Sequence, residues 1–400
     1  MTTVLSRVLP HLHLMIYQRI RHESAKRVGI RAAWPGPRCP AGPARHRGFR
    51  RWAVLLAAAS VLGCAAPPPV RPAPAVPGPT SAAVRPAASL QASPAASLQA
   101  SPAAASPAGT AAPLVASSPA VTVNAATIAV RLPSANSRAV AFADGGAILL
   151  CGGLTDSGTT GVVLRIDLQA GRVTSAGRLA EPVHDAGGAL LGGSPLVLGG
   201  GSLVAGTAVQ RVSADGRTVL LGHLPAPRAD LRAVDAGGRL VVVGGGTPSA
   251  PDPRVLETTD GIHYATIATL RVAVRYPAVA ALGGSVFVVG GTDLSGDVAT
   301  IQAVDLATGT VRAIGRLPVA LTDATALVLD GRLIVAGGRA GNRVQDAIWQ
   351  VDTRTGATTR IGRLPMPVAD AAGVVVGGVG YLVGGEANTR LASIISIRVR

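Results

Sequence analysis

Residues 324–338 read Ala-Thr-Ala-Leu-Val-Leu-Asp-Gly-Arg-Leu-Ile-Val-Ala-Gly-Gly. Two apolar runs of strand length flank an Asp-Gly pair, which is a strong signal for a tight hairpin turn because both residues tolerate positive φ. The second run ends in a glycine doublet. Downstream, 347–352 and 358–362 have the composition of two further strands on either side of a turn at 355–356. The stretch from Leu317 to Leu364 therefore predicts four antiparallel strands in 47 residues.

The same unit recurs along the chain. Glycine doublets follow short apolar runs at Gly152-Gly153, Gly199-Gly200, Gly244-Gly245, Gly290-Gly291, Gly337-Gly338 and Gly384-Gly385. A leucine lies 20 residues before each doublet, at Leu132, Leu179, Leu224, Leu270, Leu317 and Leu364. Six repeats of a four-stranded unit predict an all-β protein, a six-bladed β-propeller over residues 121–400. A β-sandwich would not explain the constant interval.

The repeat resembles the Kelch repeat of the galactose oxidase/Kelch-type propeller superfamily. The apolar run and doublet are followed by Val351-Asp352, Thr355-Gly356 and Leu364-Pro365. Kelch repeats usually carry a Trp on the outer strand and a Tyr or Phe before the doublet, whereas aliphatic residues and alanine occupy most of these places here. We therefore expect the blades to pack through aliphatic side chains, with small residues at the start of each inner strand.

The last unit contains a third strand, 394–399, and then ends. The segment 122–130 aligns with the fourth strands of the other units. We expect this N-terminal strand to complete the last blade, which would remove two free strand edges.

The region before the repeats contains a signal for export. An uncharged run of 11 residues, Trp52–Leu62, follows a group of arginines and precedes Gly63-Cys64. It is too short to span a bilayer, and it predicts a signal peptide over residues 1–63 with an over-long n-region. The end of the run resembles the bacterial lipobox, which implies lipidation of Cys64. The alternative is an ordinary secretory signal with an incidental cysteine.

Residues 64–120 are nearly all Ala, Pro, Ser and Val and include a duplicated octapeptide, 88–95 and 96–103. Such a composition cannot bury enough apolar surface to fold, and it predicts a disordered tether. Together with Cys64, it places the protein in the bacterial cell envelope, exported and lipid-anchored on the outer side of the cytoplasmic membrane or in the outer membrane.

The net charge of +16 does not indicate a nucleic-acid-binding protein. Residues 1–51 hold 11 basic side chains and one acid, whereas residues 121–400 hold 24 basic and 20 acidic side chains. Neither a basic stripe nor interleaved aromatic residues occur in the repeats, so we expect no nucleic-acid partner.

One position of the repeat is a candidate ligand site. The residues six places after each leucine are expected around the mouth of the central channel: Arg138, Asp185, Asp230, Tyr276, Asp323 and Asp370. Four carboxylates, an arginine and a tyrosine suit a polar or cationic ligand, such as a sugar, an amine or a hydrated metal ion. The alternative is that each Asp accepts hydrogen bonds from backbone N–H groups of its own neighbouring turn. Arg138 and Tyr276 break the pattern and are therefore the stronger functional candidates.

No catalytic residue is predicted. The histidines (His184, His223 and His263) fall in different parts of the blades and do not converge as the ligands of a copper radical oxidase would. Cys151 occupies a position that is aliphatic in the other blades, which indicates a core residue.

The sequence thus predicts a monomeric, non-catalytic binding module for a protein or glycan of the envelope, with no cofactor and no metal. The alternative is a carbohydrate-active propeller enzyme that resembles oxidases, sialic-acid isomerases or sialidases.

Overall fold

The computed structural model describes residues 121–400 with the exception of 203 and 214. The expected signal peptide, the lipidated Cys64 and the tether lie outside the described residues.

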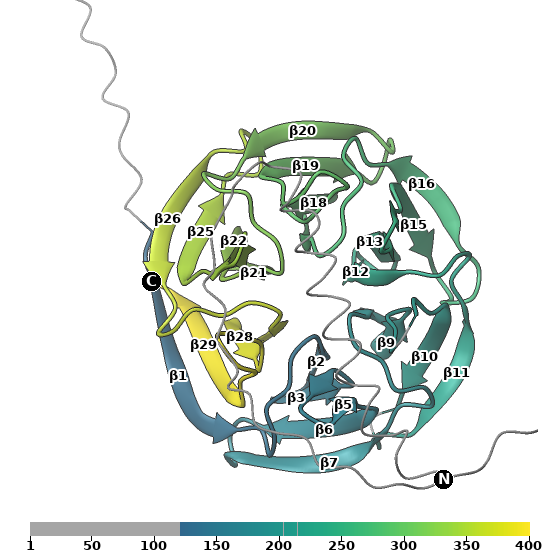
Figure 1. The fold of residues 1–400 in the computed structure, drawn as a ribbon, viewed down its shortest axis with the longest axis vertical. Helices are drawn as coiled ribbons and strands as arrows, with labels where there is room; N and C mark the ends of the chain where they lie inside the picture. Colours follow the sequence, from purple (N-terminus) through teal and green to yellow (C-terminus); the bar gives the residue numbers. More distant parts are fainter. Residues whose placement is uncertain (1–120, 203, 214) are drawn as a thin grey trace, which may run out of the picture. The chain divides into compact units, whose positions relative to one another are not determined.

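Six antiparallel sheets are arranged around a central axis, each with one strand near the axis and one on the rim (Figure 1). Blade 1 contains β2 (Val140–Asp144), β3 (Ala147–Cys151), β6 (Val162–Asp167) and β7 (Arg172–Arg178). Blade 2 contains β8 (Gly187–Leu191), β9 (Ser194–Leu198), β10 (Ala208–Val212) and β11 (Thr218–His223). Blade 3 contains β12 (Ala229–Asp235), β13 (Leu240–Thr247), β15 (Arg254–Thr258) and β16 (Ala265–Thr269), and β14 (Ala250–Pro251) pairs with β13.

Blade 4 contains β17 (Ala278–Leu282), β18 (Ser285–Val289), β19 (Thr300–Asp305) and β20 (Val311–Arg316). Blade 5 contains β21 (Thr325–Leu329), β22 (Arg332–Ala336), β25 (Ala347–Val351) and β26 (Thr358–Arg363). Blade 6 contains β27 (Ala372–Val376), β28 (Val379–Val383), β29 (Ser393–Val399) and β1 (Val123–Arg131). Two small hairpins, β4 (Leu154–Thr155) with β5 (Gly158–Thr159) and β23 (Arg339–Ala340) with β24 (Arg343–Val344), follow the doublets of blades 1 and 5. The predicted six-bladed all-β propeller is confirmed.

The N-terminal strand closes the propeller as predicted. β1 pairs antiparallel with β29, from Val123 opposite Val399 to Arg131 opposite Ser393. In Figure 1 the first strand of the described chain lies on the rim beside the last. The backbone N–H of Leu132 donates to Ala392 O at 2.9 Å, the same contact that the other five leucines make within their own blades. Blade 6 therefore contains both ends of the domain.

The glycine doublets join neighbouring blades. In blade 1 the N–H of Gly153 donates to Val183 O of blade 2 at 2.8 Å. The equivalent bond recurs at every junction, including Gly385 N to Asn136 O between blades 6 and 1. Both glycines have positive φ, and a Cβ on Gly152 would lie 2.5 Å from the Val183 oxygen. The doublet is glycine because the neighbouring blade's backbone occupies the space of a side chain.

The core lies between the blades and is mainly aliphatic. The cluster between blades 4 and 5, for example, contains Val289, Ile301 and Leu333, each 1% exposed or less. The close approach of neighbouring inner strands also depends on small residues, since a Cβ on Gly188 of β8 would meet the side chains of Val140 and Phe142 in blade 1. The expected aliphatic packing and crowded centre are both present.

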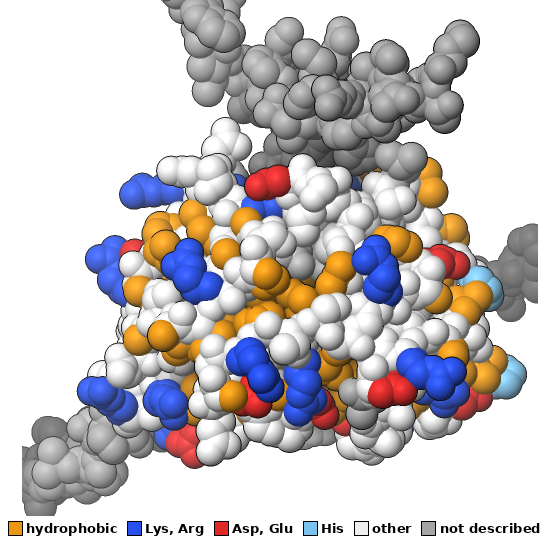
Figure 2. Space-filling model, turned by 90° about the horizontal axis from the view of Figure 1, so that it is seen from below, with side chains coloured by type: hydrophobic (Ala, Val, Ile, Leu, Met, Phe, Trp, Pro, Cys, Tyr) orange, Lys and Arg blue, Asp and Glu red, His pale blue; other side chains and the backbone are white. Residues whose placement is uncertain are grey.

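Seen edge-on, the rim carries basic side chains at separated positions, several of them next to an acidic side chain (Figure 2). On this side of the propeller the charge does not form one continuous basic surface.

Candidate functional site

One face of the propeller is formed where each inner strand begins and each second strand ends. In blade 5, Thr322 N donates to Arg339 O at 2.9 Å and Arg339 N donates back to Thr322 O at 2.7 Å. The same bridge, between the residue before each ring position and the residue after each doublet, recurs as Ser137–Leu154, His184–Gly201, Ala229–Gly246, Arg275–Thr292, Thr322–Arg339 and Ala369–Glu386. These pairs adjoin the six positions that the sequence predicts around the mouth of the central channel.

The six predicted residues form a closed ring of backbone hydrogen bonds. The N–H of each donates to the carbonyl oxygen of its counterpart in the preceding blade, over distances of 2.8–3.2 Å. The ring runs from Asp370 through Arg138, Asp185, Asp230, Tyr276 and Asp323 back to Asp370. All six residues have φ between 55° and 60°. We refer to them as the ring residues.

This backbone conformation explains why aspartate recurs in the ring. Left-handed φ is unfavourable for most L-residues, and Asp is among the few that tolerate it. Arg138 and Tyr276 lack that tolerance, so each adopts a conformation that costs on the order of 1–2 kcal/mol. Strained residues of this kind concentrate at functional sites.

The side chain of Arg138 connects three blades. Its Nη1 lies 3.1 Å from Asp185 Oδ2, and its Nε lies 3.4 Å from Glu386 Oε1 and 3.7 Å from Asp370 Oδ1. Ser137 donates a further bond of 2.8 Å to the same Glu386 oxygen.

Arg339 extends the network into blade 5. Its Nη2 lies 3.4 Å from Glu386 Oε2 and 3.5 Å from Asp370 Oδ2, and its Nε lies 3.7 Å from Asp323 Oδ2. Two guanidinium groups therefore pair with four carboxylates that are largely removed from water, which offsets part of the cost of burying these charges.

A second cluster joins blades 3 and 4. Arg275 Nε donates to Asp230 Oδ2 at 2.5 Å, and Arg275 Nη2 donates to the Tyr276 hydroxyl at 3.3 Å. The guanidinium carbon also lies 5.1 Å from the centre of the Tyr276 ring, within the range of cation–π attraction. Tyr276 additionally hydrogen-bonds the Asp230 carboxylate.

Burial and crowding alter the ionisation of this face. Burial, together with the Asp185 carboxylate, raises the pKa of Asp230 to about 7 despite its contact with Arg275. Burial and the neighbouring Asp370 raise the pKa of Asp323 well above its usual value. Burial alone would lower the pKa of Arg138, but Asp185, Asp370 and Glu386 outweigh it and raise that pKa. Arg138 is therefore a permanent cation, and Asp230 exchanges its proton near neutral pH.

The proposed turn-capping role does not apply to the ring aspartates. In the described part of the chain, none of the four accepts a side-chain hydrogen bond from a backbone N–H; they face arginines instead. Turn capping occurs in the outer hairpins of the opposite face, where Asp167, for example, accepts bonds from the N–H groups of Gln169 and Ala170. Asp260 caps the equivalent turn in blade 3.

Arg275, Arg339 and Glu386 were not among the site residues predicted from the sequence. Each lies one residue before a ring position or one residue after a doublet, where the other blades carry different side chains. Their positions in the repeat could have identified these residues, because these positions are the two partners of the backbone bridge at the mouth.

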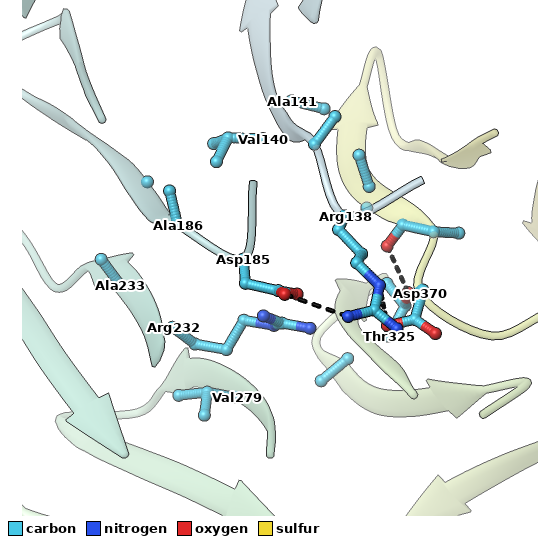
Figure 3. A pocket seen from close by; sticks show the side chains of 16 residues that line it. Arg138, Val140, Ala141, Asp185, Ala186, Arg232, Ala233, Val279, Thr325 and Asp370 are labelled. Carbon is cyan, nitrogen blue, oxygen red and sulfur yellow. Dashed lines mark hydrogen bonds and ion pairs between the residues drawn. The ribbon is translucent and has the colours of Figure 1, made fainter. Parts of the chain in front are cut away.

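A cavity of about 110 Å³ lies in the channel next to the ring, and all six blades contribute to its lining. Small side chains such as Ala141, Gly188, Ala326 and Gly373 leave this space open. Figure 3 shows Arg138 and Arg232 extending into it from different blades.

The three histidines do not converge. His184 lies on the ring face, where its Nε2 is 3.7 Å from Asp185 Oδ2, and His223 ends the rim strand β11. His263 lies in the hairpin of the opposite face, where it contacts Asp260. Burial raises the pKa of the Cys151 thiol to about 12, and the residue is 1% exposed, so it is a core residue as predicted. Among residues 121–400, apart from 203 and 214, no group of three or more His, Cys, Asp or Glu side chains is placed to hold a metal ion.

No helix in the described residues is long and apolar enough to cross a membrane.

No family model and no curated protein matches the sequence. Among solved structures, 809 chains match. One, titled "Structure of YjhT", is 14% identical with a TM-score of 0.58, and the alignment covers 68% of this chain and 99% of that chain. At this identity the similarity shows a shared propeller fold.

Proposed function

We propose that this protein is an exported, lipid-anchored envelope protein whose Kelch-type propeller binds a protein or glycan through its ring face, without catalysis. The observation that carries the proposal is the arginine–carboxylate network at the mouth, centred on Arg138. It holds charged donors and acceptors in fixed positions across four blades, and Arg138 occupies a strained backbone position that the fold itself does not require of an arginine.

Exposed apolar side chains on the same face support a binding role. Leu294 and Val204, in the loops that follow two of the doublets, are 78% and 79% exposed. Apolar side chains around a polar centre can supply contact area, while the fixed charges supply orientation.

Capture experiments with the full chain test this proposal. Leu294→Asp should reduce the capture of an envelope protein or glycan, because it places an unpaired charge in the contact area. Ile262→Asp is the matched control, since Ile262 is 45% exposed in the hairpin of the opposite face. Equal capture by both variants and by the unaltered chain would exclude the ring face as the binding surface.

Anchoring is tested separately. The chain contains three cysteines, Cys39, Cys64 and Cys151. Metabolic labelling with an alkyne fatty acid should be lost in Cys64→Ser and retained in Cys39→Ser and Cys151→Ser. Labelling that survives the Cys64 substitution would leave an ordinary secretory signal as the better interpretation.

A carbohydrate-active enzyme is the second candidate, favoured by one observation. Asp230, with a pKa of about 7, hydrogen-bonds Tyr276 at the mouth and is suited to proton transfer near neutral pH. Incubation with envelope sugars, followed by NMR, would reveal turnover, and Tyr276→Phe should abolish it while leaving the fold intact.

A further inference from the structure

Arg232 is an exception within the repeat. It lies on β12, eight residues after Leu224, where the other five blades carry Val, Gly, Ala, Thr and Ala. The propeller thus forms its inner strands without a long or charged side chain at this position. An arginine here has no role in the repeat that the other blades would share.

Arg232 is not engaged in an ion pair with any described residue. Its Nη1 donates to the neighbouring Leu231 O at 3.1 Å, and in the described part of the chain it makes no ion pair. A guanidinium carries five N–H donors, so most of those on Arg232 are available to another molecule. The side chain is half-buried, which increases the energetic need for a partner.

The space in front of this guanidinium is large enough for a ligand. Figure 3 shows Arg232 reaching into the cavity toward Arg138. The volume of about 110 Å³ exceeds several-fold the roughly 10–15 Å³ that a single water requires. Asp185 and Asp370 also line the cavity, but they pair with Arg138 and Arg339. The hydrogen-bond donors left for a ligand in this cavity are therefore mainly those of Arg232.

We propose that the channel cavity is an anion-binding site in which Arg232 holds a carboxylate group or a small inorganic oxyanion. The planar guanidinium fork matches the two oxygens of a carboxylate, and the alanine and glycine walls leave room for it. The site lies inside the ring and does not depend on which partner the ring face binds.

Titration calorimetry with acetate and with inorganic phosphate, using the full chain at constant ionic strength, tests this site. We expect saturable binding by the unaltered protein, weakened at least about tenfold in Arg232→Ala, the factor lost with one charge-assisted hydrogen bond. Alanine stands at this position in two sister blades, so the variant should fold. Arg172→Ala, at an exposed arginine on the rim strand β7, is the matched control and should bind like the unaltered chain.

Thermal unfolding supplies a second readout. Acetate should raise the melting temperature of the unaltered protein and of Arg172→Ala, but not that of Arg232→Ala. Acetate binding with phosphate excluded would identify a carboxylate site, and binding of both would identify a general oxyanion site. Absence of saturable binding by either anion, or equal binding by Arg232→Ala and the unaltered protein, would overturn the proposal.

Discussion

Replacing Gly152 with alanine should destabilise the propeller far more than the same change at Gly145, although both glycines lie in blade 1 with similar φ, +66° and +59°. A Cβ on Gly152 would lie 2.5 Å from Val183 O of the next blade, and a Cβ on Gly145 would meet nothing within 4 Å. Comparing the two variants therefore separates the cost of the steric clash at the blade junction from the cost of positive φ alone.

The two substitutions share a backbone cost on the order of 1–2 kcal/mol for an L-residue at this φ, partly offset by the lower entropy of the unfolded alanine chain. Gly152→Ala adds a clash that must push the blades apart. The separation lengthens the 2.8 Å bond from Gly153 N to Val183 O, and leaving such buried groups unpaired costs about 1–3 kcal/mol. We expect a total loss of about 3–4 kcal/mol for Gly152→Ala and about 1 kcal/mol for Gly145→Ala.

Urea and thermal unfolding of the two variants, monitored by circular dichroism, measure this difference. A gap of about 2–3 kcal/mol corresponds to melting temperatures roughly 5–10 °C apart for a domain of this size. Equal destabilisation by the two substitutions would refute the argument, because it would mean that the junction relaxes without cost.

Three other predictions concern closure and buried charge. Deleting residues 121–131 removes β1 and should abolish the single cooperative melting transition, whereas a deletion of equal length in the Ala/Pro/Ser tether should leave it unchanged. Asp230 binds its proton more tightly in the folded state, where its pKa is about 7, than in the unfolded state, where the pKa is 3.8. The free energy of unfolding should therefore fall as the pH rises from about 4 to about 7, by up to about 1.4 kcal/mol per pH unit. The urea midpoints of Asp230→Asn should not show this part of the fall. Asp252→Ala leaves Arg228, which is 1% exposed, without its carboxylate and should cost about 3–5 kcal/mol. The double change to Arg228→Leu and Asp252→Ala should recover much of that loss in equilibrium unfolding, since four sister blades carry an aliphatic residue at the Arg228 position.

The hairpin turns could be predicted because they depend on local rules, and the closing strand because the last repeat lacks a fourth strand of its own. A strand such as β22 is an apolar run that begins just after an Asp-Gly turn and ends at a doublet, and both limits are visible in the sequence. The six candidate positions at the mouth could also be found, because they lie at a fixed distance from a leucine. Their backbone conformation was not apparent, and that conformation is the reason aspartate recurs.

The sequence by itself determined the number of blades, the order of strands and the face on which the ring lies, because each blade repeats the same local backbone requirements at nearly the same spacing. Only the tertiary structure decided which charges meet. Ser137 and Glu386 are 249 residues apart and share a hydrogen bond of 2.8 Å because closure of the ring places blade 6 beside blade 1. The orientation of Arg232 into the channel also depends on all six blades together, since the cavity exists only when they enclose it.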